Sequence, residues 1–424
     1  MTYAVRCRSV ASSGMLPRLN FGCGIVILAV NSASCTSVSR RNSGETLQFG
    51  ARGTPHLNGM CSSSNPPIRG DVTLPTLQES QLVQFSTALF RAAGVDAAAS
   101  KIVAESLVQA NLRGHDSHGV MRVPFYIGKV QDGSLNPAAQ LTIEKESPCS
   151  IMADGGWGLG QVLAQDLMRR LIAKCETSAI ACGTLRRAAH IGRLGEYAEM
   201  AAARGFTSMI VANTHGSGQR VAPVGGKRPR LGTNPICLGM PGGANGPFIF
   251  DIGTSATAEG KVRVKKIAGQ PIPAGWVLDP DGKPTTDPNQ LYGDPPGTIL
   301  PLGGDQAYKG FGLAYMIDML AGGLSGGQCP FPSPPPPMGN CCVFWVINPE
   351  FFGGSSHLLG EVGKLETYVR GVPTIDGVKE VFLPGDPERR TMSDRQAKGI
   401  PLDEGNWKAL VELAGKLNVA VPAL

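Results

Sequence analysis

The chain has 424 residues, of which 42% are hydrophobic and 17% charged, a composition typical of a soluble globular protein with room for two or three domains. The chain has 39 basic and 33 acidic residues. Seven of the basic residues and one of the acidic residues lie within residues 1–70, so the remainder has 32 of each. A globular part without net charge excludes a strong electrostatic attraction to nucleic acid or to an anionic membrane, so neither is expected as a partner.

Residues 1–70 are predicted to form a separate leader. They are rich in serine and arginine and contain no acid before Glu45, which is typical of a mitochondrial or plastid transit peptide. The apolar run GIVILAV (24–30) is too short to span a bilayer, and it comes late for a secretory signal. An extension without a targeting role is the alternative. We therefore expect a mitochondrial or plastid protein if the leader is real, and otherwise a cytoplasmic one.

The eleven cysteines indicate neither a disulfide framework nor a thiolate zinc site. Their number is odd, four of them lie in the leader, and no CxxC pair occurs. The adjacent Cys341 and Cys342 cannot easily form an unstrained bridge. A reducing compartment is expected.

From Leu74 the pattern is helical. Thr76 and Glu79 have the spacing of a capping box before a helix that Gly94 ends, and a second helix is predicted to start after Asp96 and to end near Gly114. Pro124 suits the first turn of a third helix. The intervening stretch GHDSHGVMR (114–122) is therefore expected in a loop between helices, where side chains can reach a cleft.

Residues 179–213 change to a strand, helix, strand pattern. AIACGTL and TSMIVAN are predicted strands and LGEYAEMAAARG a helix, which indicates a βαβ unit with a parallel strand pair. His190, Thr214 and His215 follow these strands, at the edge where α/β sheets bind ligands. A histidine beside a helix N-terminus is also disfavoured as a cation, so it suits a neutral donor or base.

The rest of the chain is mixed. We predict a strand within PFIFDIGTS (247–255), a long loop region with short strands over 269–305, and an apolar helix over 308–327. The proline run CPFPSPPPPMG (329–339) is expected to be a stiff surface connection, with a strand after it. The end of the chain is predicted to be an amphipathic helix with Trp407, Leu410, Leu413, Ala414 and Leu417 facing inward.

The stretch GHDSHGVMR allows several kinds of chemistry. His115 and His118 have no adjacent carboxylate cluster or HExxH pattern to support a metal site, and DSHG is not the elbow of a serine nucleophile. An acid/base histidine at His118 with Arg122 as a carboxylate anchor is the better match, since an arginine can hold a carboxylate by two parallel hydrogen bonds. Local sequence leaves a polar helix end without chemistry open. His115 and Asp116 are expected to serve the turn rather than a reaction.

No nucleotide-binding fingerprint is present. GGWGLGQ (155–161) and HGSGQRV (215–221) both lack the third glycine of GxGxxG, neither is predicted to lead from a strand into a helix, and no Walker A motif occurs.

A set of motifs nevertheless resembles a known family. In order along the chain these are NLRGHDSHGVMRVPFY, AAHIGRLGEYAEMAA, GTNPIC, FDIGTSATAEGK, GWVLDPDGKPTTDP, LPLGGDQAYKGFGLAYMIDMLAGGLSGG and GIPLDEGNWKALVELA. Together, over residues 74–424, they resemble the malate/L-lactate dehydrogenases that are distinct from the Rossmann-type enzymes and that include ureidoglycolate, diketogulonate and sulfolactate dehydrogenases.

The resemblance implies an α/β fold of the non-Rossmann malate/L-lactate dehydrogenase type, in which both chain termini form a helical substrate domain and a mixed sheet forms the cofactor domain. It implies residues 71–150 with 399–424 as the helical domain and residues 151–398 as the cofactor-binding and dimerisation region. It further implies a homodimer that transfers a hydride between NAD or NADP and a 2-hydroxy acid or its 2-keto partner, such as malate or lactate, without a metal.

The resemblance also implies roles for single residues. His190 and His118 resemble the acid/base histidines, with His190 favoured as principal base, and Ser117 a supporting hydrogen-bond partner. Arg122 resembles the carboxylate anchor and Thr214 a polar substrate contact. The residues that resemble the family's cofactor-binding segments are Asp251, Thr254, Ser255, Lys261, Lys309 and Gly310.

Two departures from the family pattern stand out. His215 occupies a variable position, so it contributes specificity or nothing, and Cys341 or Cys342 replaces a histidine of the family. Intact His118, His190 and Arg122 argue against the alternative of an idle family member that acts as a binding protein.

Overall fold

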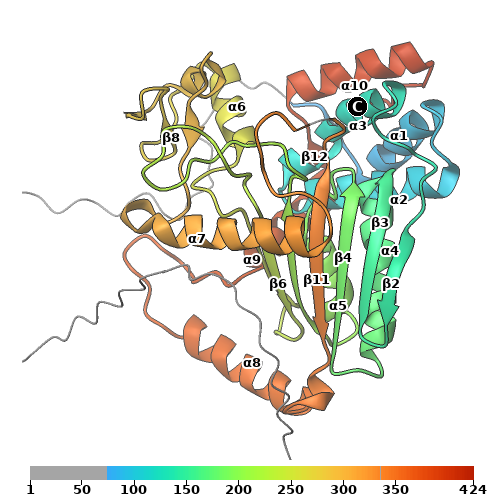
Figure 1. Ribbon diagram of the computed structural model, residues 1–424, viewed down its shortest axis with the longest axis vertical. Helices are drawn as coiled ribbons and strands as arrows, with labels where there is room; N and C mark the ends of the chain where they lie inside the picture. Colours follow the sequence, from blue (N-terminus) through green and yellow to red (C-terminus); the bar gives the residue numbers. More distant parts are fainter. Residues whose placement is uncertain (1–73, 335) are drawn as a thin grey trace, which may run out of the picture. The chain divides into compact units, whose positions relative to one another are not determined.

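The computed structural model describes residues 74–334 and 336–424 (Figure 1). The predicted leader, residues 1–70, lies outside the described residues. The α-helices are α1 (Glu79–Ala92), α2 (Ala97–Leu112), α3 (Val123–Gln131), α4 (Gly160–Cys175), α5 (Gly195–Ala202), α6 (Glu259–Ile267), α7 (Tyr308–Ile317), α8 (Ser355–Arg370), α9 (Asp386–Lys398) and α10 (Glu404–Leu417). The strands are β1 (Thr76–Leu77), β2 (Thr142–Ser147), β3 (Ser150–Gly158), β4 (Ile180–Ala188), β5 (Thr207–Asn213), β6 (Ile236–Met240), β7 (Phe248–Ile252), β8 (Val277–Leu278), β9 (Pro284–Thr285), β10 (Thr298–Ile299), β11 (Asn340–Ile347) and β12 (Ile400–Pro401).

The helices α1, α2 and α3 share one hydrophobic core with the end of the chain. Leu82, Leu107 and Ile127 are fully buried in it together with Leu410 of α10, so the two ends of the described chain pack against each other (Figure 1). The amphipathic pattern of α10 is confirmed, because Leu410 and Ala414 are fully buried and the other predicted inward residues, Trp407, Leu413 and Leu417, pack against the same core.

The start of the second helix is as predicted, whereas the start of the first is not. The Asp96 side chain accepts hydrogen bonds from the first turn of α2, which confirms it as the cap. The capping box assigned to Thr76 is wrong: Thr76 lies in β1 and pairs with Pro401 of β12, and Gln78 and Gln81 form the box of α1 instead. The sequence pattern missed this pairing because its partner strand is more than 300 residues away.

Beside this helical core, the chain forms a mixed seven-stranded sheet with the strand order β2-β3-β4-β11-β5-β6-β7. The strands predicted as a βαβ unit are β4 and β5, and both exist, as does α5 between them. They run in the same direction, but they are not neighbours, because β11 lies between them and is antiparallel to both. The predicted parallel pairing is therefore wrong: a strand from residues 340–347 takes the central place, which a local pattern cannot reveal.

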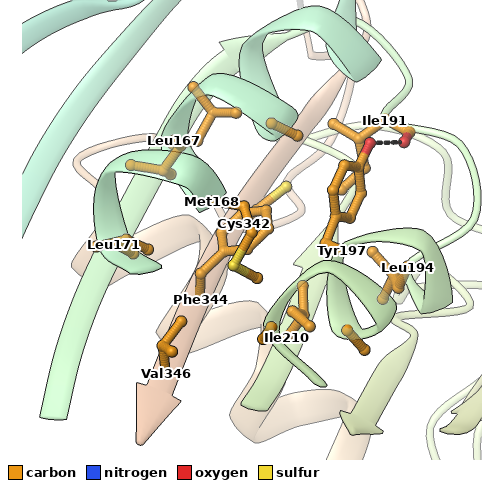
Figure 2. Close-up of a cluster of buried hydrophobic side chains, with 14 of the residues drawn as sticks. Leu167, Met168, Leu171, Ile191, Leu194, Tyr197, Ile210, Cys342, Phe344 and Val346 are labelled. Carbon is orange, nitrogen blue, oxygen red and sulfur yellow. Dashed lines mark hydrogen bonds between the residues drawn. The ribbon is translucent and has the colours of Figure 1, made fainter. Parts of the chain in front are cut away.

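One face of this sheet is covered by α4 and α5 (Figure 2). Leu167 and Leu171 of α4 and Tyr197 of α5 are fully buried against Phe344 of β11. The hydroxyl of Tyr197 donates a hydrogen bond to the carbonyl oxygen of Ile191. The apolar layer therefore also holds the chain directly after His190. Ile317 at the end of α7 packs against Val211 and Val343 on the opposite face.

The glycine-rich stretch 155–161 does lead from a strand into a helix, contrary to the prediction, since β3 ends at Gly158 and α4 begins at Gly160. A Cβ atom at Gly160 would lie 2.3 Å from the carbonyl oxygen of Ala189 and 2.4 Å from that of His190. This glycine is thus required for the close approach of α4 to the backbone at His190.

The remaining elements include the short strands of the loop region and the helix α7, which contains Lys309 and Gly310. The loop region 269–305 contains the short strands β8, β9 and β10, as predicted, in a small antiparallel sheet. The predicted apolar helix is α7, which continues as a π-helix over Asp318–Leu324. Five short 3-10 helices complete the described chain: Asp116–His118, Val120–Arg122, Pro288–Tyr292, Gly304–Gln306 and Pro349–Phe351. Among the helices of the described residues, none has an apolar stretch long enough to cross a membrane.

Candidate active site

The stretch 114–122 forms the connection between α2 and α3. It consists of two 3-10 turns that meet at Gly119, so His118 and Arg122 do not share a continuous helix face. The side chain of Asn111 organises the connection: its Nδ2 donates to Asp116 Oδ1 at 2.6 Å, and its Oδ1 accepts from the backbone N–H of Val120 at 2.8 Å. A Cβ atom at Gly119 would lie 2.2 Å from Asn111 Oδ1, so only glycine permits this contact.

This connection places the ring of His118 against the ring of His190, which follows β4. The two rings are stacked, with their centroids 5.4 Å apart. Ser117 Oγ lies 3.0 Å from Nδ1 of His118. The two histidines that are 72 positions apart in the sequence therefore form one pair.

His190 is held by a directed chain of hydrogen bonds. Nε2 of Gln161 donates to the hydroxyl of Tyr126 at 3.0 Å, and this hydroxyl lies 2.6 Å from Nδ1 of His190. The backbone N–H of Gly192 also donates to Nδ1, at 3.3 Å. Because Nδ1 accepts from Gly192, it carries no hydrogen, so the Tyr126 hydroxyl donates to it and Nε2 of His190 is the N–H donor.

Both histidines are neutral at pH 7. Burial and the neighbouring Arg122 guanidinium lower the pKa of His118 to about 3, and the same two causes hold the pKa of His190 well below its ordinary value. Burial raises the pKa of Tyr126 to about 12, so its hydroxyl keeps its proton at neutral pH. The pair thus combines uncharged imidazoles with a protonated phenol that fixes one of them.

Arg122 lies beside this pair with its guanidinium partly fixed. Its Nε donates to the carbonyl oxygen of Ser117 at 2.7 Å. Within the described residues, its two terminal nitrogens have no hydrogen-bond or ion-pair partner. A guanidinium oriented through Nε and free at both terminal nitrogens can bind a carboxylate.

His115 and Asp116 point to other partners. Nε2 of His115 lies 3.4 Å from Glu388, and Asp116 accepts two hydrogen bonds from Arg395 at 2.6 and 3.0 Å. Glu388 and Arg395 both belong to α9. These two residues therefore attach α9 to the connection between α2 and α3, which is a structural role, although the attachment is to a distant helix rather than within the turn.

Thr214 and His215 lie at the end of β5, on the same edge of the sheet as His190. The Thr214 hydroxyl donates to the carbonyl oxygen of Ser217. His215 is buried, with Nδ1 2.8 Å from Sγ of Cys341 and its ring edge-on to Trp157 at a centroid distance of 4.9 Å. Cys341 is therefore the partner of His215, whereas Cys342 faces the core between the sheet and α4 (Figure 2).

The first group of predicted cofactor residues is engaged within the protein. Asp251 accepts from the N–H of Gly195 at 2.8 Å, at the start of α5, and burial raises the pKa of this carboxyl. The hydroxyl of Thr254 donates to the carbonyl oxygens of Thr233 and Asn234, and that of Ser255 donates to Thr257. These side chains fix the conformation of the turn. A ligand would therefore contact the backbone of the turn and the residues that follow it.

The structure brings the two predicted cofactor segments together. Ser255 pairs with Pro301, and the N–H of Leu302 donates to the carbonyl oxygen of Thr254 at 3.0 Å. Gly310 of α7 packs on Leu302, where a Cβ atom would lie 2.3 Å from the carbonyl oxygen. The turn at residues 254–256 and the start of α7 are therefore adjacent.

These segments also reach the histidine pair. A Cβ atom at Gly260, in the first turn of α6, would lie 3.4 Å from Cβ of Ser117. Lys261 and Lys309 are exposed, and neither has an ion-pair partner among the described residues. The hydroxyl of Thr257 is buried, and no described residue forms a hydrogen bond with it.

Sequence reasoning missed Tyr126 and Gln161. Tyr126 is a buried residue of α3, 2% exposed, and a hydrophobic sequence pattern does not distinguish a tyrosine with a functional hydroxyl from an ordinary core residue. Gln161 is the last residue of the stretch GGWGLGQ, whose glycines suggest only a nucleotide-binding motif and give no sign of a role for the glutamine. In the described part of the chain, no three histidine, cysteine or acidic side chains are grouped so that they could hold a metal ion.

Comparisons with known proteins identify the family of the chain. Residues 77–411 match the family model described as malate/L-lactate dehydrogenase. Hydroxycarboxylate dehydrogenase B of Escherichia coli strain K12 is 37% identical over 342 residues, 80% of this chain and 93% of the relative. L-lactate dehydrogenase of Cupriavidus necator is 36% identical over 76% of this chain and 91% of its own length. The solved structure of sulfolactate dehydrogenase from Methanocaldococcus jannaschii superposes with a TM-score of 0.72 and 32% identity, covering 81% of this chain and 98% of that one.

Proposed function

The chain belongs to the malate/L-lactate dehydrogenase family, and on this premise we propose that it transfers a hydride between NAD or NADP and a 2-hydroxy acid such as malate or lactate. The observation that carries the proposal is the convergence of His118, His190 and Arg122 from two distant segments. Oxidation of a 2-hydroxy acid needs a carboxylate anchor and a group that takes the hydroxyl proton, and this cluster offers both.

Arg122 is assigned to bind the substrate carboxylate. Its Nε is held by Ser117, so the two terminal nitrogens can form parallel hydrogen bonds with both carboxylate oxygens. The bound carboxylate would also offset the guanidinium charge, which lowers the pKa of both histidines in the free protein. Substrate binding would thereby raise the pKa of the pair toward the range in which an imidazole accepts a proton.

The two histidines are assigned complementary roles. Because Nδ1 of His190 accepts from Gly192 and Tyr126, its Nε2–H can donate a hydrogen bond to the substrate oxygen in both directions of the reaction. His118 can carry its hydrogen on Nδ1 toward Ser117 and present a free Nε2, which takes the hydroxyl proton as the carbonyl forms. This assignment departs from the sequence-based preference for His190 as principal base, because an Nε2 that bears a hydrogen cannot accept the hydroxyl proton.

A nicotinamide cofactor would be held by the adjoining segments. The turn at 254–257, with the buried hydroxyl of Thr257, and the exposed cations Lys261 and Lys309 fit a ligand with hydrogen-bonding and phosphate groups. The contact of Gly260 with Ser117 puts this region beside the histidine pair. A nicotinamide bound there would supply the hydride acceptor for the oxidation of the 2-hydroxy acid.

A homodimer is part of the proposal. The helix α7 and its π-helical continuation expose a row of large apolar side chains: Leu313, Tyr315, Met316, Met319 and Leu324. An exposed apolar face of this kind supports association with a second copy. Light scattering after size-exclusion chromatography tests it, and a monomer at micromolar concentration would contradict it.

The test of the activity is a screen of the full chain with NAD and NADP against malate, lactate and sulfolactate, followed by nicotinamide absorbance. We expect turnover with at least one 2-hydroxy acid and loss of turnover in His190→Ala. Absence of turnover with every pair would favour the alternative of an idle binding protein of the same family.

A further inference from the structure

Asp318 is a buried carboxyl that the proposed reaction does not use. It opens the π-helix Asp318–Leu324 and is 3% exposed. Among the described residues, no lysine, arginine or histidine forms an ion pair with it; its only side-chain partners are two amides. Asn213 Nδ2 donates to Oδ1 at 3.0 Å, and Asn234 Nδ2 donates to Oδ2 at 2.6 Å. Burying a carboxylate that has only neutral hydrogen-bond donors costs free energy of folding, which indicates a role beyond packing for this side chain.

The first amide connects Asp318 to the substrate side of the site. Asn213 is the last residue of β5, directly before Thr214. Its Oδ1 accepts from the N–H of His215 at 3.2 Å, while its Nδ2 donates to Asp318 and to the carbonyl oxygen of Gln328, both at 3.0 Å. The orientation of this one amide therefore determines how the chain leaves β5.

Further hydrogen bonds connect Asn213 to the segment that carries His190. The carbonyl oxygen of Asn213 accepts from Nδ2 of Asn340 at 2.7 Å, and Oδ1 of Asn340 accepts from the N–H of Ile191 at 3.0 Å. Ile191 follows His190, and its carbonyl oxygen is held by Tyr197. Both backbone groups of this residue are thus bound by buried side chains, and one of these bonds leads back to Asp318.

The second amide connects Asp318 to the predicted cofactor turn. Asn234 has a left-handed backbone conformation with φ 30°, and its Nδ2 donates to the carbonyl oxygen of Ala314 at 2.9 Å as well as to Asp318. Its own carbonyl oxygen accepts from the hydroxyl of Thr254 at 3.0 Å. An unusual backbone conformation persists where the surroundings over-determine it, and the bonds to Asp318 and Ala314 do so here.

We propose that Asp318 is a positioning residue for the dehydrogenase reaction: its carboxylate, as acceptor for Asn213 and Asn234, holds the loops of His190, Thr214 and Thr254 in one arrangement. The proposal rests on the proposed function, because these three loops matter together only if substrate and cofactor meet between them. Asp318 itself touches no reacting group and acts through the two amides.

The ionised form of Asp318 is the one that can do this. A protonated carboxyl carries an O–H that would point at an amide NH2 group, which cannot accept it, so one of the two bonds is lost. Burial raises the pKa of Asp318 to about 6, although both amides oppose the shift. The titratable group facing it from the following segment is Cys329, whose thiol donates to the Asp318 carbonyl oxygen at 3.2 Å. Loss of the arrangement is therefore expected as the pH falls through about 6.

The experiment compares kcat/KM of the full chain with that of Asp318→Asn from about pH 5 to about pH 9, since kcat/KM reports the groups of the free enzyme. At about pH 8 we expect roughly tenfold lower kcat/KM in the variant, because one hydrogen bond fewer fixes the loops. We further expect the fall of the wild-type profile near pH 6 to be absent from the variant. Wild-type kcat/KM in the variant at about pH 8, or an unchanged fall near pH 6, would overturn the proposal.

A matched control is Glu366→Gln. Glu366 is a buried carboxyl on α8 that accepts from the N–H of Ala244 and from Arg370, in a network without the three loops. This variant is expected to retain the wild-type profile; loss of the same acidic fall in it would overturn the assignment to Asp318. If Asp318→Asn does not fold, Asn340→Ala takes its place. That variant removes the link to Ile191, and it must lower kcat with little change in cofactor affinity for the proposal to stand.

Stability gives a readout that does not depend on activity. The pKa of Asp318 is raised in the folded state, so above about pH 6 folding keeps this carboxyl charged in an unfavourable environment, which lowers the unfolding free energy. As the pH falls below about 6 the carboxyl is protonated in the folded state and this loss of unfolding free energy disappears. The unfolding free energy of the wild type should therefore rise relative to that of Asp318→Asn between about pH 7 and about pH 5. No such rise would overturn the account of Asp318, whereas the rise without any dehydrogenase turnover would overturn the proposed function alone.

Discussion

Residues 114–122 contain two halves that look alike in sequence and differ in what they contact. His115 and Asp116 bind Glu388 and Arg395 of α9, whereas His118 stacks on His190 beside Arg122. Each half contains one histidine and one charged residue. What separates them is the segment that each half contacts, so the partner and the burial of a side chain, rather than its type or spacing, assign it to chemistry or to structure.

The largest difference between the halves is expected from His118→Ala. Removal of the proposed proton acceptor should lower kcat by about 10³-fold, within the range for a general base, while cofactor affinity changes little. The matched change in the other half, His115→Ala, should leave kcat within about threefold of the wild type. Nicotinamide absorbance at saturating substrate measures both, and an equal loss in the two variants would end the distinction.

Arg122→Lys tests the anchor of the same half. A lysine cannot reproduce the planar pair of donors, so KM for the 2-hydroxy acid should rise roughly 30-fold, equivalent to about 2 kcal/mol, with a small change in kcat. The counterpart is Arg395→Lys, which loses a bidentate contact to Asp116 on the α9 side. Its KM should equal that of the wild type, and a similar rise there would show that the loop geometry, not the anchor, was disturbed.

Tyr126→Phe keeps the buried ring and removes only the hydroxyl. The loss of the donor to Nδ1 of His190 should lower kcat about tenfold, because the ring is then held only by the longer hydrogen bond from the Gly192 N–H. The amide of Gln161 loses its acceptor at the same time, which should reduce the unfolding free energy by about 1 kcal/mol. Reduced stability in urea with wild-type kcat would restrict Tyr126 to a packing role.

The smallest effect on activity belongs to Asp116→Ala. Arg395 and Asn111 both lose an acceptor, so the unfolding free energy should fall by about 1–2 kcal/mol while kcat stays within about threefold. Asp394→Ala, which breaks an exposed pair with Lys398 on the same helix, should change stability by less than about 0.5 kcal/mol. Urea denaturation of the two variants measures the comparison, and the reverse order of stability would contradict the structural role of Asp116.

Periodic segments were predicted well because their pattern is local. The cap at Asp96, the apolar face of α10 and the strand, helix, strand order at residues 179–213 all follow from neighbouring residues. The predictions that were wrong involve a distant partner. The local pattern predicts a helix start at Thr76, which instead pairs with β12. It also predicts a parallel pair of β4 and β5, but β11 lies between them.

The sequence by itself determined the family, through motifs that occur in a fixed order. It identified His118 and Arg122 as candidates because an imidazole suits proton transfer and a guanidinium can hold a carboxylate, and His190 through its place in one of these motifs. It could not show that Tyr126 and Gln161 fix His190, because a buried hydroxyl and a buried amide leave no trace in a pattern of polarity. The tertiary structure decided which side chains share a site. Hydrogen bonds and stacking require contact within a few ångströms, and only the folded chain brings residues 118, 126, 161 and 190 that close.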